Sequence, residues 1–295
     1  MTQAYRSVFR PGLFAGRVVL VTGGGSGIGR CTAHELAALG AHVALIGRNG
    51  GKLEAVRAEI AAAGGKASMA VCDIRDEAAV QDTVETVLRS QGRLDALVNN
   101  AGGQFPAPLK TMTLKGWEAV VKTNLTGGFL MARECVNQWM ESHGGAIVNI
   151  VADMWGSMPG MGHSGAARAG MVSFTETAAL EWAPSGVRVN AVAPGYVASS
   201  GMDSYPPAMA PLLRAAAQGV PLKRMANEAE VSAAIVFLLS EAASFITGTV
   251  LRVDGGRPQM RAGWPVAGGE PPEHDAVKPY DGFPLARVPK VFMDE

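Results

Sequence analysis

The stretch "VTGGGSGIGR" carries glycines whose spacing could hold a phosphate group. Thr22 is followed by Gly23, Gly27 and Gly29. Glycine lets the backbone turn tightly and approach a pyrophosphate closely, and the free N–H groups at the start of a helix attract an anion. Because a strand-like run precedes this stretch and a helix-like run follows it, we interpret it as a dinucleotide-binding loop rather than a flexible turn.

The end of the next apolar run, "LIGRNG", indicates which dinucleotide binds. An NAD site typically places a carboxylate here to bind the ribose 2′-hydroxyl, but this chain has Gly47 followed by Arg48. A guanidinium group can pair with a 2′-phosphate. We therefore expect NADP(H) rather than NAD(H); the alternative is that Arg48 is a solvent-facing turn residue.

Seven short apolar runs must position these loops, and they are nearly continuous, as in parallel strands covered on both faces. The predicted strands are residues 17–22, 42–47, 67–72, 94–99, 146–151, 187–193 and 249–254. The predicted helices are residues 27–39, 50–63, 76–91, 113–142, 164–183 and 227–240. This alternation predicts an α/β fold, a Rossmann-like doubly wound parallel sheet of about seven strands in a single domain.

Two segments fall outside this alternation. We divide the chain into a Rossmann-type domain, residues 1–256, and a Pro/Gly-rich C-terminal extension, residues 257–295, which is either loosely ordered or packed on a neighbouring subunit. Residues 195–220 follow a strand end, the side where open α/β sheets bind ligands. Their methionines and leucines offer adaptable apolar surface, so we expect a substrate lid, the alternative being a fixed packing segment.

The composition narrows the partners. Acidic and basic residues balance at 26 each among 295 residues, so we expect neither nucleic acid nor a membrane as a partner. Cys31, Cys72 and Cys135 are far apart and odd in number, which argues against a disulfide framework or a metal site. The start of the chain has no apolar run fit for a signal peptide, and no stretch is long enough for a membrane span. We expect a cytoplasmic protein.

Further motifs, in order, resemble those of the short-chain dehydrogenases/reductases: "NNAG" (99–102), "KTNLTG" (122–127), "RVNAVAPGYV" (188–197) and "DGG" (254–256). The resemblance covers roughly residues 14–258. It implies a homotetramer and a set of cofactor contacts. These contacts are Gly23, Ser26, Gly27, Ile28, Gly29, Arg48, Asp73, Ile74, Asn100, Ala101, Gly102, Arg168, Pro194, Gly195, Val197 and Ser199.

The central half of the chain resembles a narrower group. "GQFPAPL", "GWEAVVKTNLTGGF", "HSGAARAG" and "FLLSEAASFITG" are similar to segments of the peroxisomal trans-2-enoyl-CoA reductases. That group reduces the double bond of an enoyl thioester with NADPH, and the related dienoyl-CoA reductases share the loss of the family's usual tyrosine. This chain has no peroxisomal address, so the resemblance implies a bacterial-type relative that takes an acyl-CoA or lipid-like small molecule.

The family's proton-transfer residues are all replaced. In most members a serine, a tyrosine and a lysine do this work; here Ala152, Ser164 and Arg168 stand in their places. A serine hydroxyl is too weak an acid to act alone, and arginine stays protonated and so cannot join a proton relay. The usual interconversion of alcohol and ketone is therefore disfavoured.

Reduction of an enoyl thioester makes a different demand, because negative charge develops on the thioester oxygen and needs hydrogen-bond donors. We predict Ser164, Asn124 and His163 as donors, Arg168 as a ligand of the nicotinamide ribose and Asp153 as a residue that positions water. The alternatives are a helix N-cap for Ser164, a cap or kink for Asn124, a structural helix arginine for Arg168, a loop cap for Asp153 and an incidental loop histidine. The residues predicted to border the substrate are Gln104, Phe105 and Met202.

Three hypotheses follow from these residues. The leading one is an NADPH-dependent reductase of 2-enoyl-CoA thioesters. The second is an alcohol or carbonyl dehydrogenase acting on a lipid or terpenoid alcohol such as citronellol. The third is a catalytically silent nucleotide-binding protein, which the retained cofactor motifs do not exclude.

Overall fold

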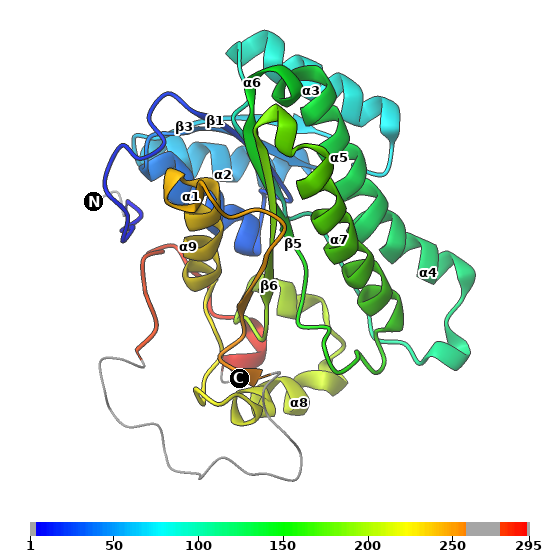
Figure 1. Ribbon diagram of the computed structural model, residues 1–295. Helices are drawn as coiled ribbons and strands as arrows, with labels where there is room; N and C mark the ends of the chain where they lie inside the picture. The colour runs from blue at the N-terminus through cyan, green and yellow to red at the C-terminus, as the bar shows by residue number, and fades with distance from the viewer. Residues whose placement is uncertain (1–3, 258–277, 294–295) are drawn as a thin grey trace.

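The apolar runs pair into one parallel sheet in the computed structural model, which describes residues 4–257 and 278–293 (Figure 1). The strand order is β3-β2-β1-β4-β5-β6-β7, so the order reverses between β1 and β4. The strands are β1 (Val18–Thr22), β2 (His42–Gly47), β3 (Lys66–Val71), β4 (Ala96–Asn99), β5 (Gly145–Ile150), β6 (Val187–Pro194) and β7 (Val250–Val253). The predicted fold class is confirmed, and the reversal opens a crevice where ligands bind in such sheets.

Helices cover both faces of the sheet (Figure 1). One face carries α1 (Gly27–Ala38), α2 (Gly50–Ala62) and α9 (Glu228–Leu239), whose apolar residues share one core with the sheet. The other face carries α3 (Glu77–Gln91), α5 (Gly127–Cys135) and α7 (Gly162–Glu181) over a second core. No helix among the described residues is long and apolar enough to cross a membrane.

The helix predicted over residues 113–142 is continuous but not uniform. Its α-helical parts are α4 (Leu114–Val121), α5 and α6 (Glu141–His143). Two π-helical turns, Lys122–Thr126 and Val136–Met140, join them. π-turns inside α-helices occur frequently at functional sites, and the first of these two carries Asn124.

The helix predicted to begin at Ser164 begins two residues earlier. Met161 is the N-cap of α7, so Ser164 is its third helical residue and the N-cap alternative for Ser164 is wrong. The extra turn starts at Gly162, where a Cβ atom would lie 2.5 Å from a methyl carbon of Leu109. A larger residue at the helix start would therefore have to displace the exposed Leu109 side chain, a tertiary contact that local sequence does not reveal.

The lid, residues 195–220, follows β6 as a series of short turns and helices. It contains α8 (Ala210–Ala215) and three 3₁₀ turns, Ser200–Ser204, Pro207–Met209 and Ala216–Gly219. Other 3₁₀ turns in the described residues are Leu109–Thr111, Ala183–Ser185, Glu241–Ala243 and Lys290–Phe292. Figure 1 shows α8 below the lower edge of the sheet, at the carboxyl ends of its central strands.

The C-terminal segment, residues 278–293, lies on the body of the same chain. Phe283 is buried beside Tyr5 and His34, and the Arg30 guanidinium donates to the Leu285 carbonyl at 3.1 Å. Residues 258–277 of the predicted extension lie outside the described residues. The division of the chain at residue 257 stays a prediction.

Candidate active site

A cavity of about 610 Å³ lies at the carboxyl ends of β1, β4, β5 and β6. The loop after each of these strands contributes to its lining, and the loop after β6 continues into the lid, which lines the cavity as well. The volume falls within the roughly 300–1,000 Å³ of small-molecule sites. The cavity therefore occupies the crevice predicted from the strand order.

The glycine-rich loop has the shape that a diphosphate requires. Gly23 and Gly27 have φ angles of +65° and +57°, a conformation that glycine adopts without strain. A Cβ atom on Gly29 would lie 2.4 Å from the Gly23 carbonyl oxygen, so only glycine fits there. Ser26 is the N-cap of α1, and its hydroxyl makes no capping hydrogen bond. Together with Ile28, which also lines the cavity, this loop fits a dinucleotide.

Thr22 ties the glycine-rich loop to the loop after β4. Its Oγ1 accepts hydrogen bonds from the backbone N–H of Asn100 at 3.0 Å and of Ala101 at 2.9 Å. The Asn100 side chain donates in return to the Thr22 carbonyl at 3.0 Å. These bonds hold Asn100, Ala101 and Gly102 in the cavity wall, where they were predicted to contact the cofactor.

Three charged groups gather near the end of β2. Asp73 accepts hydrogen bonds from Arg75, which lower the pKa of its carboxyl group to about 2, and the charge of Arg48 acts in the same direction. Arg48 is exposed and has no ion-pair partner among the described residues, whereas Arg75 was missed from the sequence although it stands two positions after Asp73. The Ile74 side chain is buried in the core, which leaves only its backbone to meet a ligand.

Arg168 lies in the cavity wall, as predicted for a ligand of the nicotinamide ribose. Its Nη1 donates to the Ile150 carbonyl at 2.5 Å. Its Nε is buried and has no hydrogen-bond partner among the residues that the structure describes. Burial lowers the pKa of Arg168 to about 10, so the side chain still carries a positive charge at neutral pH. The loop after β6 lines the same wall with Pro194, Gly195, Val197 and Ser199.

Asn124 supports the site from behind the cavity wall. Its Oδ1 accepts from the Gly103 N–H at 2.9 Å, and its Nδ2 donates to the Gly103 carbonyl at 2.9 Å. The side chain is buried and does not line the cavity. In this structure Asn124 fixes the loop after β4, and the predicted hydrogen bond to substrate stays a prediction.

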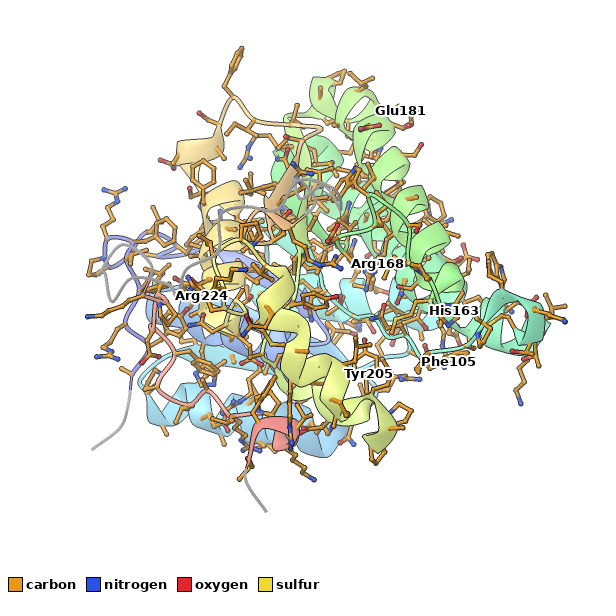
Figure 2. The ribbon with its side chains drawn as sticks, turned by 90° about the horizontal axis from the view of Figure 1, so that it is seen from below. Phe105, His163, Arg168, Glu181, Tyr205 and Arg224 are labelled. Atoms are coloured by element: carbon orange, nitrogen blue, oxygen red, sulfur yellow. The ribbon has the colours of Figure 1, made fainter. Side chains whose placement is uncertain are left out.

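Ser164 and His163 lie close to the cavity but are fully buried. The Ser164 hydroxyl donates to Gln104 Oε1 at 2.7 Å, and Gln104 Nε2 donates to the Tyr205 hydroxyl at 2.6 Å. His163 Nδ1 accepts from the Ser164 N–H at 2.8 Å, and its Nε2 has no partner among the described residues. The centroids of the His163 and Phe105 rings lie 4.6 Å apart, and the two rings meet edge-on. Figure 2 shows His163 and Phe105 side by side. The hydrogen of the Ser164 hydroxyl is therefore already donated to Gln104.

Asp153 lies at the rim of the cavity. Its Oδ2 accepts from Arg257 Nη1 at 2.9 Å, and the Arg257 guanidinium stacks over the Tyr196 ring at 4.7 Å. Its Oδ1 is buried and has no hydrogen-bond partner in the part of the chain that the structure describes. The positioning of a water by Asp153 stays a prediction.

The lid makes its wall of the cavity largely apolar. Met202 is 8% exposed and lines the cavity, as predicted for a substrate contact. The lid also supplies Met209, Leu212, Leu213 and Ala216, and the loop between β5 and α7 adds Met158, Pro159 and Met161 to the lining. Methionine adapts its shape to irregular ligands. The residues 158–161 were missed because a loop without periodicity gives no sign that it faces a cavity.

A doubly wound sheet with a glycine-rich loop, a buried arginine in the cavity wall and an adjoining apolar surface is the arrangement typical of dinucleotide-dependent oxidoreductases. The family model described as "Enoyl-(Acyl carrier protein) reductase" matches residues 23–257. The chain belongs to the short-chain dehydrogenase/reductase family and is an oxidoreductase of that type. Its resemblance to the enoyl-CoA reductase group is confirmed, because proteins named as 2,4-dienoyl-CoA reductases are among its relatives.

Relatives within the family act on different substrates. A Bacillus subtilis protein named "Probable 2,4-dienoyl-CoA reductase" is 38% identical over 248 residues, 82% of this chain and 96% of the relative. The solved structure of a citronellol catabolism dehydrogenase (AtuB) from Pseudomonas aeruginosa PAO1 is 57% identical, with a TM-score of 0.79, and covers 86% of this chain and 100% of its own. An NAD(P)-dependent gluconate 5-dehydrogenase structure from Beutenbergia cavernae, with NADP bound, is 36% identical with a TM-score of 0.79 over 85% of this chain and 100% of its own.

Proposed function

We propose that this chain is an NADP(H)-dependent reductase of the carbon–carbon double bond of 2-enoyl-CoA thioesters. The observation that carries the proposal is a complete dinucleotide crevice beside a helix that has Ser164 and Arg168 in place of the family's tyrosine and lysine. The similarity to a protein named as a dienoyl-CoA reductase supports the same reaction class.

The residues of the crevice hold the cofactor in this proposal. The loop from Gly23 to Gly29 binds the diphosphate, Arg48 binds the 2′-phosphate, and Arg168, whose guanidinium lies in the cavity wall, binds the nicotinamide ribose. Bound NADPH supplies a hydride to substrate. Arg168 also keeps a positive charge close to the reacting atoms.

The remaining polar groups act on the thioester. Hydride addition at C3 moves negative charge onto the thioester oxygen, which donors fixed before the reaction stabilise best. Ser164 holds the Gln104 side chain at this part of the site, His163 adds an imidazole beside it, and Asn124 keeps the neighbouring loop in place. Asp153, which lines the cavity, positions a water, and the apolar lid takes the acyl chain.

A specific observation favours a second candidate, a dehydrogenase of a terpenoid alcohol. The solved structure named as a citronellol catabolism dehydrogenase is 57% identical to this chain. The methionine- and leucine-rich lid suits a branched terpenoid chain as well as an acyl chain. The two candidates share the cofactor and the apolar cavity, and they differ in the bond that changes.

Turnover assays separate these candidates. The purified protein is mixed with NADPH and a panel of 2-enoyl-CoA thioesters, then with aldehydes and ketones, and finally with NADP⁺ and citronellol, while the nicotinamide absorbance is followed. The proposal expects NADPH oxidation with enoyl-CoA alone. Turnover with carbonyls or alcohols alone supports the second candidate and overturns the first, and cofactor binding without any turnover overturns both.

A further inference from the structure

The lid brings a phenol to the cavity, although the catalytic helix has none. Tyr205 follows the 3₁₀ turn Ser200–Ser204 and lines the cavity. Figure 2 shows Tyr205 reaching from the lid toward the loop that carries Phe105. A phenolic hydroxyl is a far stronger acid than a serine hydroxyl, so this side chain supplies the group that the helix lacks.

Two hydrogen bonds connect Tyr205 to the position where the family's tyrosine is missing. Ser164 Oγ donates to Gln104 Oε1 at 2.7 Å, and Gln104 Nε2 donates to the Tyr205 oxygen at 2.6 Å. In the structure the Gln104 amide turns its oxygen to the buried Ser164 hydroxyl and its nitrogen to Tyr205. With its oxygen turned to Ser164, that amide can only donate to Tyr205.

The direction of these bonds leaves the phenolic hydrogen available. The Tyr205 oxygen accepts from Gln104, and no group in residues 4–257 or 278–293 accepts a hydrogen bond from Tyr205. The hydroxyl lines the cavity, so a bound substrate is the acceptor within its reach. The same Gln104 N–H would stabilise the oxygen if it lost its proton, because a donor to an anion makes a stronger bond than a donor to a neutral group.

We propose that Tyr205 is the catalytic acid, and that Gln104 and Ser164 are positioning residues. The inference rests on the proposed function, with a reduced nicotinamide as the hydride donor. Hydride forms the new C3–H bond, and the electron pair of the C2=C3 bond moves to give an enolate. As the enolate re-forms the thioester carbonyl, the O–H bond of Tyr205 breaks, its proton forms the C2–H bond, and its electron pair stays on the phenolate oxygen. Water then returns a proton to Tyr205.

The C-terminal segment holds the lid that carries this acid. Asp203, two residues before Tyr205, accepts from the Lys290 N–H at 2.9 Å. Arg214 of α8 donates to the Val291 carbonyl at 2.7 Å. The lid therefore positions the proton donor over the substrate cavity, and α7, which carries Arg168, does not.

A phenol in this position also widens the chemistry open to the site. Serine and arginine alone cannot protonate an alkoxide, which is the reason for disfavouring ketone reduction from the sequence. Tyr205 removes that obstacle, because general acid catalysis by a positioned side chain serves an alkoxide as well as an enolate. The acid assigned here thus operates under either candidate function.

The main test is Tyr205→Phe in the full-length protein. We expect kcat with the preferred substrate to fall by about 100-fold or more, whereas the Kd of NADPH, measured by fluorescence titration, stays unchanged. Tyr280→Phe is the matched control: it removes a phenolic hydroxyl that bonds the Arg6 carbonyl, far from the cavity, and should leave kcat unchanged. Undiminished kcat in Tyr205→Phe would overturn the assignment.

Gln104→Glu tests the direction of the hydrogen bonds. The carboxylate has nearly the same shape but can only accept, so it takes the Tyr205 hydrogen and withdraws it from substrate. We expect kcat to fall by about 10-fold or more with a small change in KM, and Gln104→Glu, Tyr205→Phe to be no slower than Tyr205→Phe alone. If Gln104 only bridges the lid to α7, Gln104→Glu keeps the bridge and kcat, which contradicts the proposal.

These outcomes separate the acid from the proposed reaction. Turnover of carbonyls alone, lost in Tyr205→Phe, supports the acid while overturning enoyl reduction. Turnover of enoyl-CoA that survives Tyr205→Phe supports the reaction while overturning the acid. Absence of turnover by the unmodified protein on every substrate overturns both.

Discussion

Arg48 and Arg75 lie on the same side of the dinucleotide crevice but are not equivalent. Arg75 forms a forked hydrogen bond with Asp73, and the low pKa of that carboxyl keeps the pair ionised at neutral pH. Arg48 has no ion-pair partner among the described residues and remains exposed to solvent. The guanidinium of Arg48 is therefore the one free to meet a 2′-phosphate without first breaking an ion pair.

Replacing Arg48 should change cofactor preference. In Arg48→Ala we expect the KM for NADPH to rise by about 10-fold or more, because a hydrogen bond to a charged group contributes roughly 1.5–3 kcal/mol, while the KM for NADH stays the same. The measurement is steady-state kinetics with both cofactors. Arg89→Ala on α3 is the control, since Arg89 is also exposed and, in the described part of the chain, its side chain bonds only Thr86. Equal KM values for NADPH in Arg48→Ala and the unmodified protein would show that Arg48 is a turn residue.

The lid depends on a connection between elements that are distant along the chain. The 3₁₀ turn of Lys290–Phe292 lies against the lid through Asp203 and Arg214. Residues 278–285 of the same C-terminal segment are held by the body of the protein, where Asn227 donates to the Tyr280 carbonyl at 2.9 Å. One end of the segment is thus fixed to the fold and the other end holds the lid.

Asp203→Ala should loosen the lid without harming cofactor binding. Losing a single hydrogen bond of about 1 kcal/mol corresponds to roughly a fivefold effect, so we expect kcat/KM for the substrate to fall by about that factor, with an unchanged Kd for NADPH. The control is Asp281→Ala in the C-terminal segment, because the side chains of both Asp281 and its ion-pair partner Arg6 are largely exposed. An unaltered kcat/KM in Asp203→Ala would mean that the lid is held by its own packing.

At the scale of the whole molecule, a buried carboxyl group links the core to the cofactor loop. Glu228 opens α9, is 6% exposed, and lies near Gly27 of the glycine-rich loop. Burial raises the pKa of Glu228 to about 7, although the charge of Arg30 acts in the opposite direction. Burial also raises the pKa of Glu35 on the facing helix α1, so both groups favour a protonated folded state.

The raised pKa of Glu228 makes stability fall as pH rises. The folded state holds a proton that the unfolded state has released above its ordinary pKa of 4.5, so stability present at pH 4.5 is lost progressively toward pH 7. The loss is at most about 3 kcal/mol. We expect Tm, measured by scanning fluorimetry, to fall between pH 5 and pH 8 in the unmodified protein and less in Glu228→Gln. Parallel curves for the two proteins would contradict this, because both retain Glu35.

The sequence by itself determined the sheet, the crevice and the class of cofactor. Continuous apolar runs can be recognised in the sequence because a strand buried on both faces needs apolar residues along its whole length. The glycines of the first loop can be recognised because Gly23, Gly27 and Gly29 occupy backbone positions that a Cβ atom would strain or block. These are local requirements, and local requirements leave a local pattern. Assembly as a homotetramer stays a prediction.

Only the tertiary structure decided which side chains meet in the cavity. The sequence identified Ser164 and the absence of the tyrosine. Gln104, which bonds Ser164, and Tyr205, which bonds Gln104, come from two other loops. The lid has no periodicity, and the C-terminal segment that holds it returns from the far end of the chain. A hydrogen bond between residues so far apart depends on where the whole fold places them, and no spacing in the sequence records it.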